Sequence, residues 1–186
     1  MGSQTKCAKT AIVTGASSGI GARCASALAA AGFRVCLTAR RRERLNEVVT
    51  AIRRQHGQGT AQAEVGDVTS EDDRRRTLKA VLCRWGYLDL LVNNAGYALP
   101  GTVEDLRVDA VRELFEVNCL AYLAWMQEVT QVMAWQPRRG RIVNIGSVSG
   151  LVAFPGLGAY AARKYAVEAF SDAARRELGP LGIPVV

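Results

Sequence analysis

The chain has 186 residues, 49% of them hydrophobic, and a formal net charge of +7. This suits one domain with a core, and no run of eighteen apolar residues occurs, so a membrane-spanning helix is not expected. The basic residues form three clusters without interleaved aromatic residues or a nucleic-acid motif, so we expect no nucleic-acid partner and interpret the clusters at 74–76 and 138–141 as solvated helix faces.

Short β-branched runs alternate with helical stretches along the chain. Residues 10–14 predict a buried strand that ends at a glycine-rich turn, and an alanine-rich helix is expected over about residues 20–31. We expect further strands at 35–38, 60–65, 88–92 and 141–145, and helices at about 42–55, from near Ser70, at about 109–135 and at about 159–178. This alternation predicts an α/β fold with a doubly wound parallel sheet of the Rossmann type, in three α/β/α layers.

Residues 183–186 are expected to open a sixth strand. A strand that ends after so few residues leaves backbone groups of its neighbour unpaired. We therefore interpret residues 1–186 as a single dinucleotide-binding domain truncated within the sixth strand, and expect the last strand or strands to lie in a continuation of the protein.

Three glycines, Gly15, Gly19 and Gly21, follow the first predicted strand. Backbone N–H groups and the helix dipole attract a pyrophosphate at such a place. The spacing is not the Gly-x-Gly-x-x-Gly fingerprint, and an ordinary glycine-rich turn is the alternative. The position directly after the first strand favours phosphate binding. Ser17 and Ser18, within the loop, are either phosphate contacts or turn formers.

Tyr160 and Lys164 lie one turn apart on the same face of a predicted helix, with about 5–6 Å between β-carbons. An ammonium there favours the phenolate and would lower the tyrosine pKa from about 10. The Ser147 hydroxyl could hold a substrate oxygen at the tyrosine, which would make a proton-transfer device for a carbonyl or an alcohol. Taken alone, the pair could simply solvate a helix face.

The sequence resembles the short-chain dehydrogenases/reductases over essentially its whole length. The motifs that carry the resemblance, in the order and spacing of the family, are Thr14–Gly21, Asn93–Gly96, Asn118, Ser147 and Tyr160-x-x-x-Lys164. The resemblance implies an NADP(H)-dependent oxidoreductase that interconverts a carbonyl and a secondary alcohol. The alternative is a catalytically inactive dinucleotide-binding protein with a regulatory or scaffold role, or an inactive fragment.

The resemblance also assigns a catalytic tetrad. In the reductive direction, hydride from NADPH would reach a carbonyl carbon while Tyr160 gives its proton to the oxygen, which Ser147 orients. Lys164 would lower the tyrosine pKa and bind the nicotinamide ribose. Asn118 would hold a water that continues the proton relay to Lys164.

The choice of NADP rests on the end of the second strand. An NAD enzyme of this layout usually has an acidic residue there, whereas this chain has Ala39 followed by Arg40 and Arg41. Guanidinium groups pair with a 2′-phosphate, and the dipole at a helix start disfavours positive charge without such a partner. The alternative is that both arginines only solvate the helix start.

Further cofactor contacts follow the third and fourth strands by resemblance. Asp67 and Val68 match a pair that contacts adenine, although Asp67 could equally be a turn or cap acceptor. For Asn93, a structural role in the sheet and a role in cofactor binding are about equally well supported. The full set of expected cofactor contacts is Gly15, Ser17, Ser18, Gly19, Ile20, Gly21, Arg40, Arg41, Asp67, Val68, Asn94, Ala95, Gly96, Tyr160 and Lys164.

Five cysteines at 7, 24, 36, 83 and 119 show no metal-like spacing, so we expect free thiols, a cytoplasmic protein and no metal. The apolar loop at residues 150–157 is expected to line the substrate site and to favour an apolar or bulky carbonyl or alcohol. By analogy with the family, the helices at 109–135 and 159–178 predict a homodimer or homotetramer.

Overall fold

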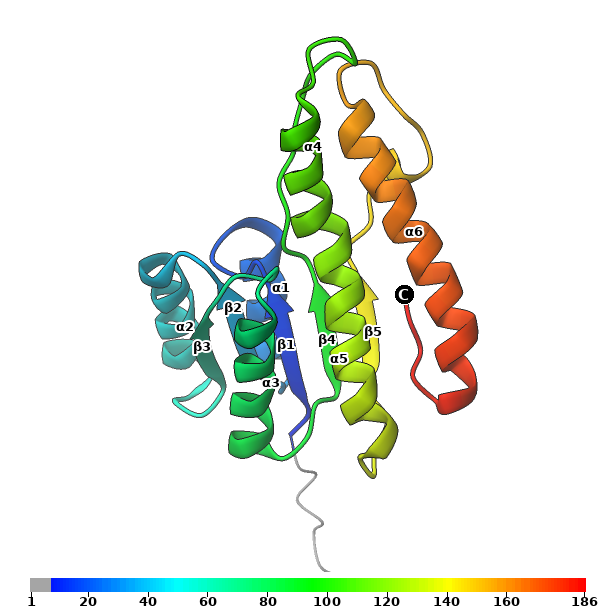
Figure 1. Cartoon of the computed structure of the whole chain (residues 1–186). Helices are drawn as coiled ribbons and strands as arrows, with labels where there is room; N and C mark the ends of the chain where they lie inside the picture. Colours follow the sequence, from blue (N-terminus) through cyan, green and yellow to red (C-terminus); the bar gives the residue numbers. More distant parts are fainter. Residues whose placement is uncertain (1–7) are drawn as a thin grey trace, which may run out of the picture.

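The computed structural model describes residues 8–186, and the sheet within them has parallel strands in the order β3-β2-β1-β4-β5 (Figure 1). The strands are β1 (Thr10–Thr14), β2 (Arg34–Ala39), β3 (Ala61–Val65), β4 (Leu90–Asn93) and β5 (Arg141–Asn144). From β1 the chain first adds strands on one side and then crosses to add β4 and β5 on the other. Ligands bind at the carboxyl ends of the strands where the order reverses, which here lies between β1 and β4.

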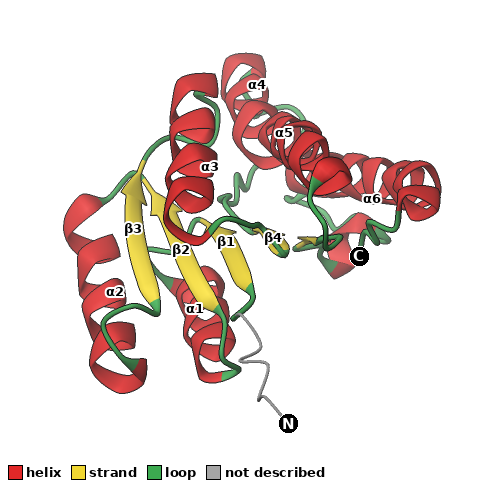
Figure 2. Ribbon diagram, turned by 90° about the horizontal axis from the view of Figure 1, so that it is seen from below, coloured by secondary structure: helices red, strands yellow, loops and turns green. Residues whose placement is uncertain are grey.

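Helices cover both faces of the sheet, which confirms the predicted three-layer α/β/α fold. One face carries α1 (Gly19–Ala30) and α2 (Arg42–His56), and the other carries α3 (Glu71–Trp85), α5 (Ala121–Trp135) and α6 (Gly158–Leu178) (Figure 2). The expected strands and helices are present with bounds shifted by one or two residues, except for the helix at 109–135 and the strand at 183–186.

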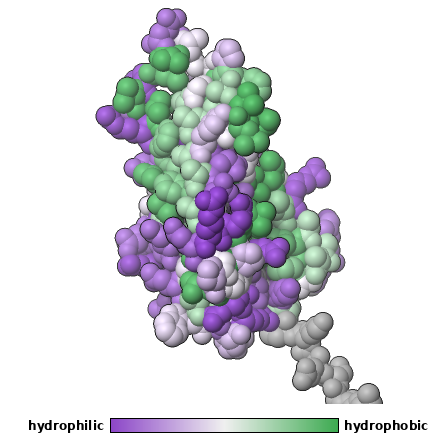
Figure 3. All heavy atoms as spheres, turned by 90° about the vertical axis from the view of Figure 1, so that its right-hand side faces the viewer, coloured by the Kyte–Doolittle hydropathy of each residue, from purple (hydrophilic) through white to green (hydrophobic). Residues whose placement is uncertain are grey.

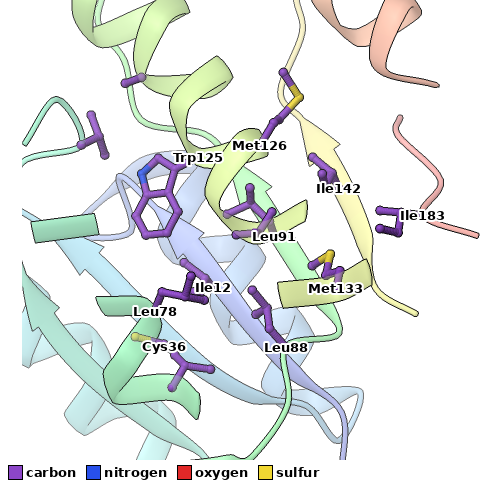
Figure 4. Packing of buried hydrophobic residues seen from close by; sticks show 14 of the residues in the cluster. Ile12, Cys36, Leu78, Leu88, Leu91, Trp125, Met126, Met133, Ile142 and Ile183 are labelled. Carbon is purple, nitrogen blue, oxygen red and sulfur yellow. The ribbon is translucent and has the colours of Figure 1, made fainter. Parts of the chain in front are cut away.

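The sheet separates the two larger hydrophobic clusters of the core. Ile12 and Cys36 point toward α3 and α5 and pack with Leu78 and Trp125 (Figure 4). Their strand neighbours Ala11, Val13 and Leu37 point toward α1 and α2. A parallel sheet that is covered on both faces needs apolar side chains at successive positions, as the sequence of β1 provides.

The helix predicted at 109–135 is not continuous. It consists of α4 (Val108–Phe115), a π turn (Glu116–Leu120) and α5. A π turn shifts the backbone hydrogen bonds from i+4 to i+5, and such turns are frequent at functional sites. Asn118 lies in the middle of the turn and is fully buried. The prediction of one regular helix was therefore wrong at this point.

The interpretation of two arginine clusters as solvated helix faces was wrong for Arg74, which is buried, and for the cluster at 138–141, which lies between α5 and β5 and at the start of β5. Arg74 is 8% exposed, and its Nε donates to Oε1 of Glu128 at 2.9 Å. Arg138 follows α5 rather than lying on a helix, and its Nε lies 2.7 Å from Oδ1 of the buried Asp89. A carboxylate partner makes these partly or fully buried guanidinium groups tolerable, because buried charges require pairing.

The chain after α6 returns to the sheet beside β5. Val185 forms a parallel bridge to Ile142, and the Ile142 N–H donates to the Pro184 carbonyl at 3.0 Å. The expected sixth strand thus begins here as a single bridge. Within residues 8–186, no helix has the length and apolar character that crossing a membrane would need. Four cysteines are free in this part of the chain, and Cys7 lies outside the described residues.

Candidate active site

An open cleft of about 670 Å³ lies at the carboxyl ends of the strands. It contains most of the residues predicted for cofactor and substrate. Those that line it are Gly15, Ser17, Ser18, Gly19, Ile20, Arg40, Arg41, Asp67, Val68, Asn94, Ala95, Gly96, Tyr160 and Lys164. Gly21, Asn118 and Ser147 do not line it and lie in the surrounding structure.

The glycine loop forms one wall of the cleft, and its shape depends on glycine. Gly15 has φ +64°, and a Cβ there would lie 2.7 Å from the Ala95 Cα. A Cβ on Gly21 would lie 2.6 Å from the Gly15 carbonyl oxygen. Both distances are shorter than real Cβ atoms show, so side chains are excluded. The exposed backbone at the N-terminus of α1 suits the phosphates of a dinucleotide.

The segment after β4 is tied to the end of β1 by Thr14. The Thr14 Oγ1 accepts the N–H groups of Asn94 at 2.9 Å and Ala95 at 3.0 Å, and Asn94 Nδ2 donates to the Thr14 carbonyl at 2.9 Å. Asn93 is fully buried and its Nδ2 donates to Asn144 Oδ1 at 2.9 Å. Asn93 therefore links β4 to β5, whereas Asn94 lines the cleft. Sequence reasoning did not identify Thr14 as the anchor of this segment.

Two arginines form a basic rim at the end of β2. The Arg41 guanidinium donates to Ser17 Oγ at 3.0 Å and to Ser18 Oγ at 2.6 Å. Arg40 is exposed and lies 3.7 Å from the Asp67 carboxylate. The loop serines are thus bonded to a cation, which is not a feature of a simple turn.

Asp67 forms a turn and also lines the cleft. Its Oδ1 accepts the Thr69 N–H at 2.9 Å and the Thr69 hydroxyl at 2.8 Å, as a turn acceptor does. It also lines the cleft. The turn therefore fixes the carboxylate at the edge of the cavity.

The opposite end of the cleft is formed by α6. Lys164 is 3% exposed, its Nζ donates to the Ile145 carbonyl, and it lies in the same lining as the half-buried Tyr160. Burial, together with a smaller effect of the Arg163 charge, lowers the pKa of Lys164 to about 8, and Glu168 opposes the shift. The predicted one-turn spacing thus places both groups at one site.

Ser147 and Asn118 lie next to this end of the cleft. Ser147 Oγ accepts the Ser149 N–H at 3.2 Å, and the preceding residue Gly146 lines the cleft. Both polar atoms of the Asn118 side chain are bonded to the Tyr97 backbone: Oδ1 accepts its N–H at 3.1 Å and Nδ2 donates to its carbonyl at 2.6 Å. The Asn118 amide is therefore committed to holding the segment that carries Tyr97, which itself lines the cleft.

The apolar loop at 150–157, expected to line the substrate site, does not line this cleft. Leu151, Val152 and Phe154 are 71%, 49% and 46% exposed. The loop runs beside the segment after β4, with a bridge between Leu157 and Gly101. Figure 3 shows hydrophobic side chains gathered toward the end of the molecule where these loops lie.

Arg163 and Tyr122 also line the cleft, and sequence reasoning missed both. Arg163 is 3% exposed, and its guanidinium carbon lies 4.1 Å from the centroid of the Tyr160 ring. The only available signal was its spacing: a residue three positions after Tyr160 shares its helix face. Among residues 8–186, no group of His, Cys, Asp and Glu side chains is arranged to hold a metal ion.

The lowered pKa of Lys164 gives a prediction for stability. Between the folded pKa of about 8 and the unfolded value of 10.5, the unfolded chain binds more protons, so the free energy of unfolding should rise with pH. Below pH 8 the ammonium is charged in both states and its burial cost is constant. The stability of the wild type relative to Lys164→Met should therefore increase between about pH 8 and 10 in urea denaturation without cofactor. Parallel pH profiles would contradict it.

The sequence matches a protein-family model and several known relatives. The family model described as short chain dehydrogenase matches residues 9–186. Dehydrogenase/reductase SDR family member 7B of Xenopus laevis is 32% identical over 182 residues, which are 96% of this chain and 56% of that protein. The uncharacterized oxidoreductase YusZ of Bacillus subtilis is 38% identical over 94% of this chain and 61% of its own length. The chain thus spans about three fifths of these relatives.

Solved structures show the same fold. A short-chain dehydrogenase from Streptomyces avermitilis superposes with a TM-score of 0.89 at 37% identity, over 97% of this chain and 64% of that one. A short chain dehydrogenase from Bacillus anthracis gives a TM-score of 0.90 at 29% identity, over 95% and 73%. Because the family model covers nearly the whole chain, and the cleft contains the glycine cradle and the Tyr160–Lys164 pair, the chain belongs to the short-chain dehydrogenase family.

Proposed function

We propose that residues 1–186 form one dinucleotide-binding domain of an NADP(H)-dependent oxidoreductase that interconverts a carbonyl and a secondary alcohol. The observation that carries this proposal is that Tyr160 and Lys164 line the same cleft as the glycine loop. A proton donor and a phosphate cradle in one cavity are what transfer between a nicotinamide cofactor and a carbonyl requires.

The residues of this chain would bind the cofactor, orient the substrate and protonate its carbonyl oxygen. The backbone of the loop from Gly15 to Gly21 would hold the pyrophosphate of the dinucleotide. The bound dinucleotide would supply the hydride. The Tyr160 hydroxyl would protonate the carbonyl oxygen during reduction and accept the alcohol proton during oxidation. The buried Lys164 ammonium would hold the ribose hydroxyls and, when charged, favour the phenolate.

Ser147 and Asn118 would act beside that pair. Because Ser147 Oγ accepts the Ser149 N–H, its own proton remains able to donate to the substrate oxygen. Asn118 would support the proton relay to Lys164 by holding the π turn and the Tyr97 segment in place, since its amide is bonded to the Tyr97 backbone. A relay water bound through the Asn118 amide, as the resemblance implied, has less support from this geometry.

The basic rim supports NADP over NAD. Ala39 lines the cleft at the end of β2 without a carboxylate, and Arg41 reaches across to the two loop serines. A 2′-phosphate at this rim would meet guanidinium donors, and the one carboxylate nearby, Asp67, is paired with Arg40.

Two further proposals concern the oligomeric state and the cellular compartment of the protein. We propose a homodimer or homotetramer through α5 and α6, by analogy with the family, which sedimentation of the purified protein would test. Free thiols at all four described cysteines support a cytoplasmic setting.

The direct test is a panel of neutral ketones, oxo acids, sugars and the corresponding alcohols, followed through nicotinamide absorbance. We expect NADPH-dependent reduction of at least one class and oxidation of its alcohol with NADP. Tight NADPH binding without turnover of any member would favour the regulatory or scaffold alternative. Absence of binding by either nucleotide would contradict both.

A further inference from the structure

Arg163 is a buried cation at the catalytic end of the cleft. It lies between Tyr160 and Lys164 on the inner face of α6, is 3% exposed, and stacks against the Tyr160 ring with 4.1 Å from guanidinium carbon to ring centroid. The guanidinium also has a side-chain hydrogen bond to Tyr160, and stacking through its face leaves its other in-plane N–H donors available. Its Nε is buried and has no hydrogen-bond partner within the described part of the chain.

No carboxylate is among the groups that act electrostatically on Arg163 itself, although Glu168 on the same helix acts on the adjacent Lys164. The electrostatic neighbours of Arg163 are Tyr160 and Lys164 on α6, Tyr122 on α5 and Cys119 on the π turn. Burial raises the pKa values of Tyr122 and Cys119, which keeps both uncharged near neutral pH. No carboxylate of residues 8–186 forms an ion pair with the Arg163 guanidinium.

Arg74, another buried arginine of this chain, has a carboxylate partner. Its Nε bonds to the Glu128 carboxylate at 2.9 Å, and its NH1 bonds to the Val68 carbonyl at 2.9 Å. The acidic residue that lines the cleft, Asp67, is paired with Arg40 near the end of β2. Arg163 thus lacks a carboxylate partner beside the proposed proton donor, whereas the neighbouring Lys164 donates to the Ile145 carbonyl and is influenced by the Glu168 carboxylate.

We propose that Arg163 is a specificity residue that binds a carboxylate on the substrate, so that the preferred substrates are oxo acids and hydroxy acids rather than neutral ketones and alcohols. This inference rests on the proposed function, because it names the substrate class of the same site. The planar guanidinium suits a carboxylate, which accepts two parallel N–H bonds. Its contact with the Tyr160 ring places the carboxylate within a few atoms of the reacting carbon.

The first test compares oxo acids with their methyl esters, which share the carbon skeleton and lack the charge. We use 2-, 3- and 4-oxo acids with NADPH, and expect kcat/KM for the best acid to exceed that of its ester by about tenfold or more, as one charged hydrogen bond provides. Arg163→Met should remove this difference, and Arg163→Lys should retain part of it. Arg176→Met, at an exposed position of the same helix, is the matched control and should retain the full difference.

A second measurement is independent of turnover. Isobutyrate, an unreactive carboxylate, should bind the NADP complex of the wild type about tenfold more tightly than that of Arg163→Met by calorimetry. Arg163→Gln serves if the Met variant does not fold. Equal binding to both proteins, or equal kcat/KM for acid and ester in an active wild type, would overturn the carboxylate site and leave the proposed function intact.

The remaining outcomes are also decisive. Preference for a phosphate monoester over every carboxylate, lost in Arg163→Met, would overturn the carboxylate assignment. If NADPH binds but nothing is turned over, the proposed function fails, and the isobutyrate measurement alone decides the fate of this inference.

Discussion

Replacing Tyr160 by Phe is expected to lower kcat by about 10²–10⁴-fold, the range that a positioned general acid or base contributes, while NADPH binding stays nearly unchanged. The substitution removes the hydroxyl and keeps the ring. The ring contact with the Arg163 guanidinium, 4.1 Å from its centroid, is therefore retained, and the surrounding packing has no reason to change. The measurement is single-turnover reduction together with NADPH titration by fluorescence.

Tyr165 provides a matched control for this result. It lies on the same helix, is 45% exposed, and its hydroxyl donates to the Leu151 carbonyl outside the cleft. Tyr165→Phe should keep kcat within about twofold, since a net exposed hydrogen bond is worth little. If Tyr160→Phe retained wild-type turnover, the proton donor would be another group. A parallel loss in both variants would instead indicate a general effect on the helix.

The sheet and the glycine cradle were predictable because their causes are local. A β-branched run followed by glycine specifies β1, and the tight approach at Gly15 and Gly21 leaves room for no other residue. The one-turn spacing of Tyr160 and Lys164 likewise determines a shared helix face. Such features depend on residues near one another in sequence.

The features that were missed depend on partners distant in sequence. The π turn at Glu116–Leu120 accompanies bonds between Asn118 and Tyr97, 21 residues apart, which no helical periodicity can reveal. Arg74 is buried because Glu128, 54 residues away, pairs with it. In the sequence, Arg163 is a charged residue within a helical stretch, which normally indicates an exposed position. It is buried because α6 packs against the π turn. Charge alone did not distinguish these arginines from exposed ones.

Removal of the two rim arginines should weaken the binding of NADPH relative to NADH. For the Arg40→Ala, Arg41→Ala double variant, we expect Kd for NADPH to rise by about 10–100-fold, as the loss of one or two charge-assisted bonds implies, with little change for NADH. Arg41 should contribute more than Arg40. It already reaches Ser17 and Ser18 in the phosphate loop, whereas Arg40 is exposed and paired with Asp67. Fluorescence titration of each variant with both nucleotides measures the ratio.

Ala39→Asp tests the same rim by adding charge instead of removing it. Ala39 lines the cleft at the end of β2, so a carboxylate there would repel a 2′-phosphate and could accept hydrogen bonds from the ribose hydroxyls of NADH. The ratio of NADPH affinity to NADH affinity should therefore fall by about tenfold or more, because the affinity for NADPH falls and the affinity for NADH rises. Arg44→Ala, an exposed change on α2 at a residue paired with Glu47, is the control and should leave the ratio unchanged. An unaltered ratio in both Ala39→Asp and the double variant would place the phosphate elsewhere and remove the argument for NADP, because no other guanidinium lines the cleft at this end among residues 8–186.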